Sequence, residues 1–381
     1  MKHPRHPSLR GVLLLGAFAL VLSLALWACG DEQSTLAPAE PSLNTYGANL
    51  PEFAQAIGVH NRVIPEILAT PKVVGTAVGA DERGKPVIRI YTAEFVPVGR
   101  LKDQYDGFRV VQEVTGPIKP MKGKPVPGAS GKTKQTPPVK MGTSGGWRYD
   151  LANGFCCGGT LGSLVQKGGT KYVLSNYHVL YADIVSGGNS RVATAGDPVV
   201  QPGLIDVACN AATSQNVASL VANGGSLPDA GNPDAVDCGI ASVISGMVDE
   251  SGAILNVGTI SASTRSATVG LAVKKMGRTT GLTRSSISGI NGAFSITYEN
   301  ECAGGTSFTQ SYSGQIVISN GACAFQNGGD SGSLLLADVT TNPRAVGLCF
   351  AGSSVCSGSS IAIANPIGKV LTKLGATMVG L

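Results

Sequence analysis

The sequence predicts a mainly β protein, in which a C-terminal domain of many short strands follows a small α+β domain. Short apolar runs, separated by turns rich in Gly, Asn and Asp, follow one another from about residue 145 to the end of the chain. The 381 residues include 52 glycines and only 14% are charged, as expected for short strands joined by tight turns. Such a series favours a sandwich or barrels.

Residues 1–29 have the pattern of a bacterial targeting segment. Basic residues at the start precede an apolar run over 12–27, which is short for a membrane span and typical of a signal peptide. The run ends at Cys29 in a context that resembles the lipobox of bacterial lipoproteins. We therefore expect lipidation of Cys29 and an exported protein that is anchored to the cell envelope or secreted. Residues 30–49 predict a flexible spacer.

Residues 50–116 predict a small α+β domain. Apolar residues recur at near-helical spacing over 53–68, and two apolar runs at 72–79 and 86–91 flank a turn and predict a β-hairpin. A further strand is expected over 108–114. This segment shows no catalytic motif and is compatible with a folding module, an inhibitory pro-domain or an interaction module.

Residues 117–144 predict an extended linker. Between 117 and 140 there are six prolines, six lysines and no acidic residue, a composition that cannot form a packed core. Residues 1–140 carry 17 basic against 11 acidic residues, and residues 141–381 carry 12 against 13. The net charge of +5 therefore arises in the N-terminal part and says nothing about the substrate of the C-terminal domain. No basic stripe is interleaved with aromatic residues, and no nucleic-acid partner is expected.

The chain is expected to end in a helix. Asn365 is the predicted N-cap and Pro366 the first-turn residue, and apolar residues then recur on one face as far as Leu374.

The most specific motif is Gly-Gly-Asp-Ser-Gly at 328–332, which leads straight into an apolar strand. Glycines allow the positive φ of a tight turn, and the N–H groups of Gly329 and Ser331 could then face a carbonyl oxygen above the Ser331 hydroxyl. A serine nucleophile needs a base. Of the four histidines, only His178 shares the β domain with Ser331.

Together, Leu-Ser-Asn-Tyr-His-Val at 174–179 and the later Gly-Asp-Ser-Gly resemble the chymotrypsin-like (trypsin-like) serine peptidases. The resemblance runs from about Gly158 to the C-terminus and is nearest to bacterial members related to the plant narrow-leaf protease. It implies a double β-barrel over residues 145–381, with His178 as base, Ser331 as nucleophile, and the N–H groups of Gly329 and Ser331 as the oxyanion hole.

The acid that orients the histidine is expected between His178 and Ser331. Asp237 immediately precedes an apolar strand, as the family's aspartate precedes its small apolar run, and is the preferred candidate. Asp206 is the alternative. An α/β-hydrolase is excluded because no histidine follows Ser331.

The resemblance also places substrate-binding residues. Phe325, six residues before the nucleophile, would lie at the base of the specificity pocket, and Phe350 and Gly352 would lie on the strand that pairs with the substrate. No acid stands at the pocket base, so a shallow or apolar pocket is expected rather than one for Arg or Lys.

Eight cysteines remain besides Cys29, and an even number in an exported chain predicts disulfides rather than a metal site. The expected pairs are Cys302–Cys323, Cys349–Cys356 and Cys209–Cys238. The function expected is an exported serine endopeptidase that acts on peptides or proteins without a cofactor. The alternative is a catalytically weak protease-like module that binds peptides or proteins.

Overall fold

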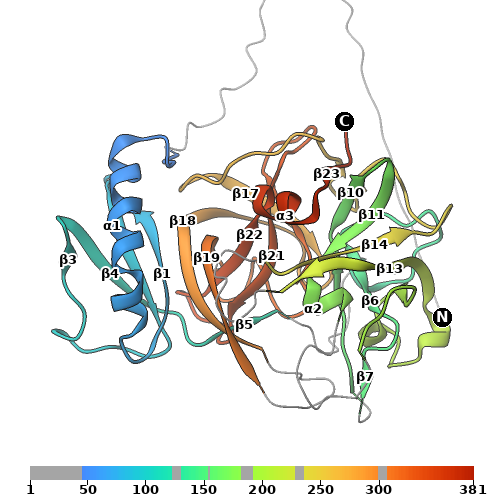
Figure 1. Cartoon of the computed structure of the whole chain (residues 1–381), viewed down its shortest axis with the longest axis horizontal. Coiled ribbons are helices and arrows are strands. Elements are labelled where there is room, and N and C mark those ends of the chain that lie inside the picture. The colour runs from blue at the N-terminus through green and yellow to red at the C-terminus, as the bar shows by residue number, and fades with distance from the viewer. Residues whose placement is uncertain (1–44, 122–129, 153–154, 182–191, 228–235, 299–306) are drawn as a thin grey trace, which may run out of the picture. The chain divides into compact units, whose positions relative to one another are not determined.

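The computed structural model describes residues 45–121, 130–152, 155–181, 192–227, 236–298 and 307–381 (Figure 1). The expected targeting segment and the lipidation site Cys29 lie outside these ranges. The described chain is mainly β, with two large sheets and a short C-terminal helix. Within these ranges, no helix is long and apolar enough to cross a membrane.

The first sheet has eight strands and carries the histidine side of the site. Buried side chains of its strands, such as Leu164, Val173 and Leu174, belong to one apolar core with Trp147. The strand order is β23 (Thr377–Met378), β10 (Ser163–Lys167), β11 (Thr170–Ser175), β14 (Cys238–Val243), β13 (Gln215–Ser226), β12 (Pro198–Gln201), β6 (Thr143–Trp147) and β9 (Gly159–Leu161).

The second sheet has eleven strands and carries the serine side. β17 also pairs with β18, so this part of the sheet curves back on itself. The order is β17 (Ala272–Gly277), β20 (Leu334–Ala337), β21 (Ala345–Ser353), β22 (Ile361–Pro366), β19 (Phe308–Ser319), β18 (Gly281–Tyr298), β1 (Val73–Ala80), β2 (Pro86–Thr92), β4 (Phe108–Val114) and β3 (Gln104–Tyr105), with β5 (Ile118–Pro120) on β21.

β18 is one long strand that runs from Gly281 to Tyr298. Its pairing with β19 shifts register at several points, including between Gly289 and Gly292. A bulge increases the bend of a strand without ending it, so β18 curves at these glycines and continues.

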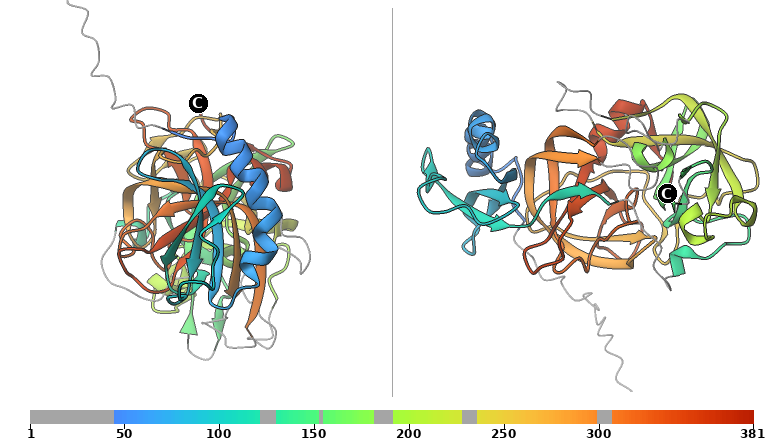
Figure 2. Two further views of the ribbon diagram at one scale, coloured as in Figure 1. Left: turned by 90° about the vertical axis from the view of Figure 1, so that its left-hand side faces the viewer. Right: turned by 90° about the horizontal axis from the view of Figure 1, so that it is seen from below.

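The α+β segment joins the second sheet through its hairpin. Helix α1 (Pro51–Leu68) buries Phe53, Ala56 and Ile67 against strands β1 and β2, and β4 lies parallel to β2. β1 pairs antiparallel with β18, with Gly75 opposite Phe294 (Figures 1 and 2). The strands of this segment thereby continue the sheet that carries Ser331.

Part of the segment expected to be a linker also forms strands. β5 lies on β21, with Lys119 opposite Gly352, and residues 143 and 144 belong to β6 in the first sheet. Residues 122–129, between these two strands, lie outside the description. The chain therefore passes from the N-terminal strands to the first sheet by way of β21.

The C-terminal helix α3 (Ile367–Leu374) begins one residue later than expected. Its N-cap is Pro366, because the side chain of Asn365 is bound to the backbone of Asp237 and is not available for a capping bond. The helix ends at Gly375, whose φ of 61° is the left-handed conformation that closes many helices.

The remaining elements are short. They are α2 (Tyr177–Leu180), the 3₁₀ turns η1 (Ser130–Lys132), η2 (Leu204–Asp206) and η3 (Ala211–Thr213), and the small ladders β7 (Leu151–Ala152) with β8 (Phe155–Cys156) and β15 (Ala253–Ile254) with β16 (Gly258–Thr259).

The expected cysteine pairs are wrong. The structure joins Cys156 to Cys209 and Cys323 to Cys356, and Cys157 is disulfide-bonded as well. Cys238 and Cys349 are free thiols, buried in the apolar cores on β14 and β21. Burial raises the pKa of both thiols, that of Cys349 to about 12, so neither is a ready thiolate at neutral pH.

Candidate active site

His178 and Asp237 are brought together by two neighbouring elements of the first sheet. His178 lies in the single turn of α2, directly after β11, and Asp237 directly precedes β14, which pairs with β11. The ring Nδ1 of His178 lies 2.5 Å from Oδ2 of Asp237, and both side chains are buried. This contact puts the ring proton on Nδ1 and leaves a lone pair on Nε2, as a general base requires.

The backbone around Asp237 is fixed by two asparagines. Asn176 donates to the Asp237 carbonyl at 2.8 Å. Asn365 donates to the same carbonyl and accepts from the Asp237 N–H at 3.3 Å. The second carboxylate oxygen, Oδ1, accepts from the backbone N–H groups of Tyr177 and His178 at 2.8 and 3.3 Å. The position of the acid is therefore set by the helix turn that carries the histidine.

A buried tyrosine adds a further donor to Asp237. The hydroxyl of Tyr298, at the end of β18, donates to Oδ2 at 2.9 Å, and Tyr312 on β19 is hydrogen-bonded to the Tyr298 hydroxyl. Burial, followed by the Asp237 charge, raises the pKa of both tyrosines well above the usual value, so both stay neutral donors. The sequence gives no sign of this pair, because neither tyrosine lies in a motif.

Ser331 lies on the loop between β19 and β20, where two glycines allow the turn. Gly329 has φ +98° and Gly332 has φ +91°. A Cβ on Gly332 would stand 2.2 Å from the carbonyl oxygen of Thr160, and one on Gly329 would stand 2.4 Å from the Thr279 hydroxyl. The turn is thus restricted to glycine by conformation and by space.

The Ser331 hydroxyl donates to the carbonyl oxygen of Phe350 at 3.0 Å, and not to the imidazole of His178. Nε2 of His178 is buried and makes no hydrogen bond with any residue that the structure describes. In enzymes, such bonds are often long or misaligned before substrate is in place. The structure thus places His178, the expected base, beside Asp237, the expected acid, while the Ser331 hydroxyl faces Phe350 O.

The residue before the nucleophile, Asp330, is bound from the β17–β18 turn. Its carboxylate accepts from the N–H groups of Thr279 and Thr280, at 2.8 and 3.2 Å, and from the Thr280 hydroxyl at 2.7 Å. The ammonium of Lys275 lies 3.4 Å from Oδ2, and both side chains are fully buried. The Gly-Arg-Thr-Thr-Gly turn therefore fixes the conformation of the serine loop.

Thr160, on β9 of the first sheet, ties the serine loop to that sheet. Its hydroxyl donates to Gly329 O at 2.9 Å and accepts from the Arg278 N–H at 2.9 Å, and its own N–H donates to Ser331 O at 2.8 Å. The sequence showed Thr160 only as a strand residue. Its partners are over a hundred residues away, so no local pattern could reveal this role.

Asp206, the alternative acid, is engaged elsewhere. Both of its carboxylate oxygens accept from the guanidinium of Arg278, at 2.8 and 2.5 Å, in a buried two-point ion pair. This pair joins η2 near the first sheet to the β17–β18 turn of the second.

The expected substrate-binding residues surround a segment of the chain itself. The Phe350 carbonyl accepts from the Met121 N–H at 2.9 Å, and the Gly329 N–H donates to Met121 O at 2.6 Å. Gly352 lies opposite Lys119 in the β5–β21 pair. Phe325 is buried in the second core, where its ring lies 5.6 Å from the Lys275 ammonium.

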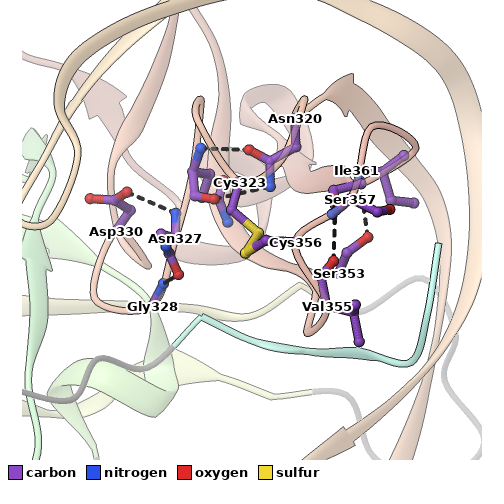
Figure 3. The surroundings of a disulfide bond; sticks show 12 residues. Asn320, Cys323, Asn327, Gly328, Asp330, Ser353, Val355, Cys356, Ser357 and Ile361 are labelled. Atoms are coloured by element: carbon purple, nitrogen blue, oxygen red, sulfur yellow. Dashed lines mark hydrogen bonds between the residues drawn. A yellow bond between two sulfur atoms is a disulfide. The ribbon is translucent and has the colours of Figure 1, made fainter.

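A disulfide braces this side of the site (Figure 3). Cys323 precedes the serine loop and Cys356 follows β21, so their bond links the two segments that border Ser331. On the same loop, Asn327 N–H donates to Asp330 Oδ2 at 3.0 Å. Among the described side chains, no group of three or more His, Cys, Asp or Glu could hold a metal ion.

Comparison with known families confirms the resemblance that the sequence predicts. Residues 212–363 match the family model described as the Nal1 C-terminal domain. This range includes Asp237 and Ser331 and begins after His178. No curated protein sequence matches the chain significantly.

Solved structures of serine proteases resemble the chain in fold. A glutamic-acid-specific serine protease that uses a histidine triad in substrate binding is 20% identical, with a TM-score of 0.40, over 63% of this chain and 100% of that one. Thermobifida fusca protease A is 20% identical, with a TM-score of 0.41, over 64% and 99%. Cellulomonas bogoriensis chymotrypsin is 20% identical, with a TM-score of 0.39, over 64% and 99%.

Proposed function

We propose that this chain, of which residues 212–363 match the Nal1 C-terminal domain, is a serine endopeptidase with a chymotrypsin-like fold. Its two sheets would correspond to the two six-stranded barrels of that fold. The observation that carries the proposal is the buried 2.5 Å contact between His178 Nδ1 and Asp237, since it leaves Nε2 as a free base. The disulfides favour action in an oxidising, extracytoplasmic compartment.

The proposed reaction is acyl transfer through Ser331. His178 Nε2 takes the hydroxyl proton as the Ser331 oxygen attacks the carbonyl carbon of a peptide bond, and later gives that proton to the departing amine. Asp237 holds the tautomer and stabilises the imidazolium. The N–H groups of Gly329 and Ser331 would bind the oxyanion, and loss of one such donor costs about 10²–10³ in rate.

The test compares wild type with Ser331→Ala and His178→Ala. The wild-type chain should hydrolyse casein and react covalently with a fluorophosphonate probe. Each substitution should lower kcat by about 10⁴–10⁶, because nucleophile and base act as one unit. Unchanged melting would show that the fold is retained.

A protease-like binding module is the second candidate, favoured by the Ser331 hydroxyl pointing to Phe350 O rather than to His178. It would bind peptides without turnover. A folded wild-type chain that binds peptides but neither reacts with the probe nor cleaves any peptide would establish it and exclude the peptidase.

A further inference from the structure

One segment of the chain lies along the strand on which a peptide substrate is expected. β5 pairs antiparallel with the stretch of β21 beyond its pairing with β20, with Ile118 opposite Ser353 and Lys119 opposite Gly352. The Met121 N–H then donates to Phe350 O at 2.9 Å. Addition of an extended segment to a strand is a general mode of peptide recognition, in which backbone bonds provide the affinity.

The carbonyl group of Met121 lies at the expected oxyanion hole. Its oxygen accepts from the Gly329 N–H at 2.6 Å. The Phe350 carbonyl that accepts from the Met121 N–H also accepts from the Ser331 hydroxyl, at 3.0 Å. The amide of Met121 and the nucleophile therefore converge on one backbone oxygen, while the Met121 carbonyl is held by a donor of the nucleophile loop.

The residues at the two ends of the segment 118–121 have buried apolar side chains. Met121 is 6% exposed, and a Cβ on Gly352 would stand 2.6 Å from its terminal methyl carbon, so glycine at 352 leaves room for a long side chain. Ile118 is 3% exposed and packs with Phe350 and Ile361. The site thus encloses a long, unbranched apolar side chain at the residue whose carbonyl is bound by Gly329.

We propose that residues 118–121 are a tethered, substrate-like occupant of the active site, and that the site prefers methionine immediately before the bond it cleaves. This inference rests on the proposed peptidase function. The peptide bond that follows Met121 is then a substrate in cis, and other peptides must compete with residues 118–121 for β21.

The step in cis is ordinary hydrolysis. The Ser331 oxygen forms a bond to the Met121 carbonyl carbon, its proton passes to His178 Nε2, and the bond to the following nitrogen breaks as that nitrogen receives the proton. Water then adds to the ester carbon and gives one proton to His178. The bond between that carbon and the Ser331 oxygen breaks, and the oxygen receives the proton from His178. The products are a carboxylate at Met121 and an amino group at Lys122, with one water consumed.

Cleavage would not empty the site. Residues up to Met121 remain linked to the N-terminal strands, and β1 is paired with β18 of the second sheet. A tethered segment has an effective concentration of the order of millimolar, so even a weakly binding product stays in place. The chain is therefore self-inhibited towards other peptides before and after the cut.

The first experiment reads the cleavage site by mass spectrometry and N-terminal sequencing of the purified full chain. Wild type should yield a fragment that begins at Lys122, and Ser331→Ala should stay intact. Met121→Asp should slow this cleavage by roughly ten- to a hundredfold, since burying a methionine side chain contributes about that factor and a carboxylate cannot replace it. Met121→Leu, the matched apolar control, should still be cut.

The second experiment uses added fluorogenic peptides. The wild-type chain should cleave Ile-Lys-Pro-Met-anilide at least about tenfold faster than the same peptide ending in Asp. This comparison uses the wild-type protein alone. Met121→Asp should cleave the methionine peptide roughly tenfold faster than Met121→Leu, because its occupant binds β21 less well.

The outcomes separate this inference from the proposed function. Casein cleavage that requires Ser331, with no fragment starting at Lys122 and no preference for the methionine peptide, would overturn the inference and leave the peptidase. Absence of any Ser331-dependent cleavage by both wild type and Met121→Asp would overturn the peptidase and the inference with it.

Discussion

Two buried carboxylates border the site, and the chain compensates their charges differently. Among the described residues, the donors to the carboxylate of Asp237, on the histidine side, are neutral apart from the imidazole: two backbone N–H groups and the Tyr298 hydroxyl. Asp330, on the serine side, accepts from Thr279 and Thr280 and lies 3.4 Å from the ammonium of Lys275. Asp330 is thus paired with a permanent cation, whereas no Lys or Arg within the described ranges forms an ion pair with Asp237.

The difference separates a structural acid from a catalytic one. A buried charge is costly unless it is paired and hydrogen-bonded, and a permanent cation makes the pair an inert brace. Neutral donors hold a carboxylate in place but leave its charge to stabilise an imidazolium when one forms. By this reasoning, Asp330 shapes the serine loop, and Asp237 would be the acid that takes part in the proposed proton transfer.

The largest effect that would sharpen this contrast is expected for Asp237→Asn. The amide would favour the wrong imidazole tautomer and should lower kcat by about 10⁴, with little change in melting because no buried cation loses its partner. The measurement is kcat on casein or a peptide anilide, together with a melting curve. A larger loss for Asp206→Asn would show that the wrong acid has been assigned.

Asp330→Asn should show the opposite pattern. It would leave the Lys275 ammonium buried without its carboxylate, which costs about 3–5 kcal/mol in the free energy of unfolding. The double variant Asp330→Asn with Lys275→Met should recover a large part of that loss, as measured by denaturant unfolding. Equal stability of the single and double variants would mean that the ion pair does not stabilise the loop.

The local parts of this site could be predicted from the sequence. The serine loop is readable because positive φ at Gly329 and Gly332 demands glycine, and Asp237 is readable because it directly precedes an apolar strand. The short strands also follow from local turns and apolar runs. In each case, the sequence within a few residues determines the conformation.

The residues that sequence reasoning missed act across the fold. Asn365 holds Asp237 from 128 positions away, and Tyr298 reaches the same acid from 61 positions away. Their contacts depend on how the two sheets pack against each other, and such packing produces no periodic pattern in the sequence. Asn365 was read as a helix cap because its local context fits one. The disulfide pairs could not be predicted for the same reason, since Cys323 lies near Cys356 only after β21 has taken its position in the folded sheet.

His60 is a second buried histidine, and its partners in the described chain are Thr76 and Asn291 rather than an acid. It shows what burial does to a histidine that lacks the acid partner of His178. His60 lies between Thr76, 3.1 Å from its Nε2, and Asn291, whose amide donates to its Nδ1 at 3.1 Å. Burial lowers the pKa of His60 from about 6.5 to about 4. The folded state therefore disfavours the charged form that the unfolded chain takes up below about pH 6.5.

Stability from a neutral His60 is present above about pH 6.5 and is lost as pH falls through about 4. The loss amounts to about 3 kcal/mol in the free energy of unfolding. His60→Gln should remove this part of the pH dependence, which urea unfolding of both proteins between pH 4 and 7 would reveal. Parallel curves for the two proteins would contradict this role of burial.

The smallest expected effect is on kcat and comes from removing the neutral side-chain donor to Asp237. It tests most directly the contrast between Asp237 and Asp330. Tyr298→Phe keeps the ring and removes the hydroxyl that lies 2.9 Å from Oδ2. A hydrogen bond to a charged group contributes about 1.5–3 kcal/mol, so kcat should fall by about ten- to a hundredfold. KM should hold, because the carboxylate acts when the imidazolium forms and not when the peptide binds.

Two matched tyrosines show whether the hydroxyl or the packing matters. Tyr91→Phe removes a buried hydroxyl that makes no hydrogen bond with any described residue, and should leave kcat unchanged. Tyr312→Phe leaves the bond from Tyr298 to Asp237 in place and should lower kcat less than Tyr298→Phe does. If Tyr298→Phe changed only the melting temperature, Tyr298 would be a packing residue. The neutral donors around Asp237 would then not explain a difference in function between Asp237 and Asp330.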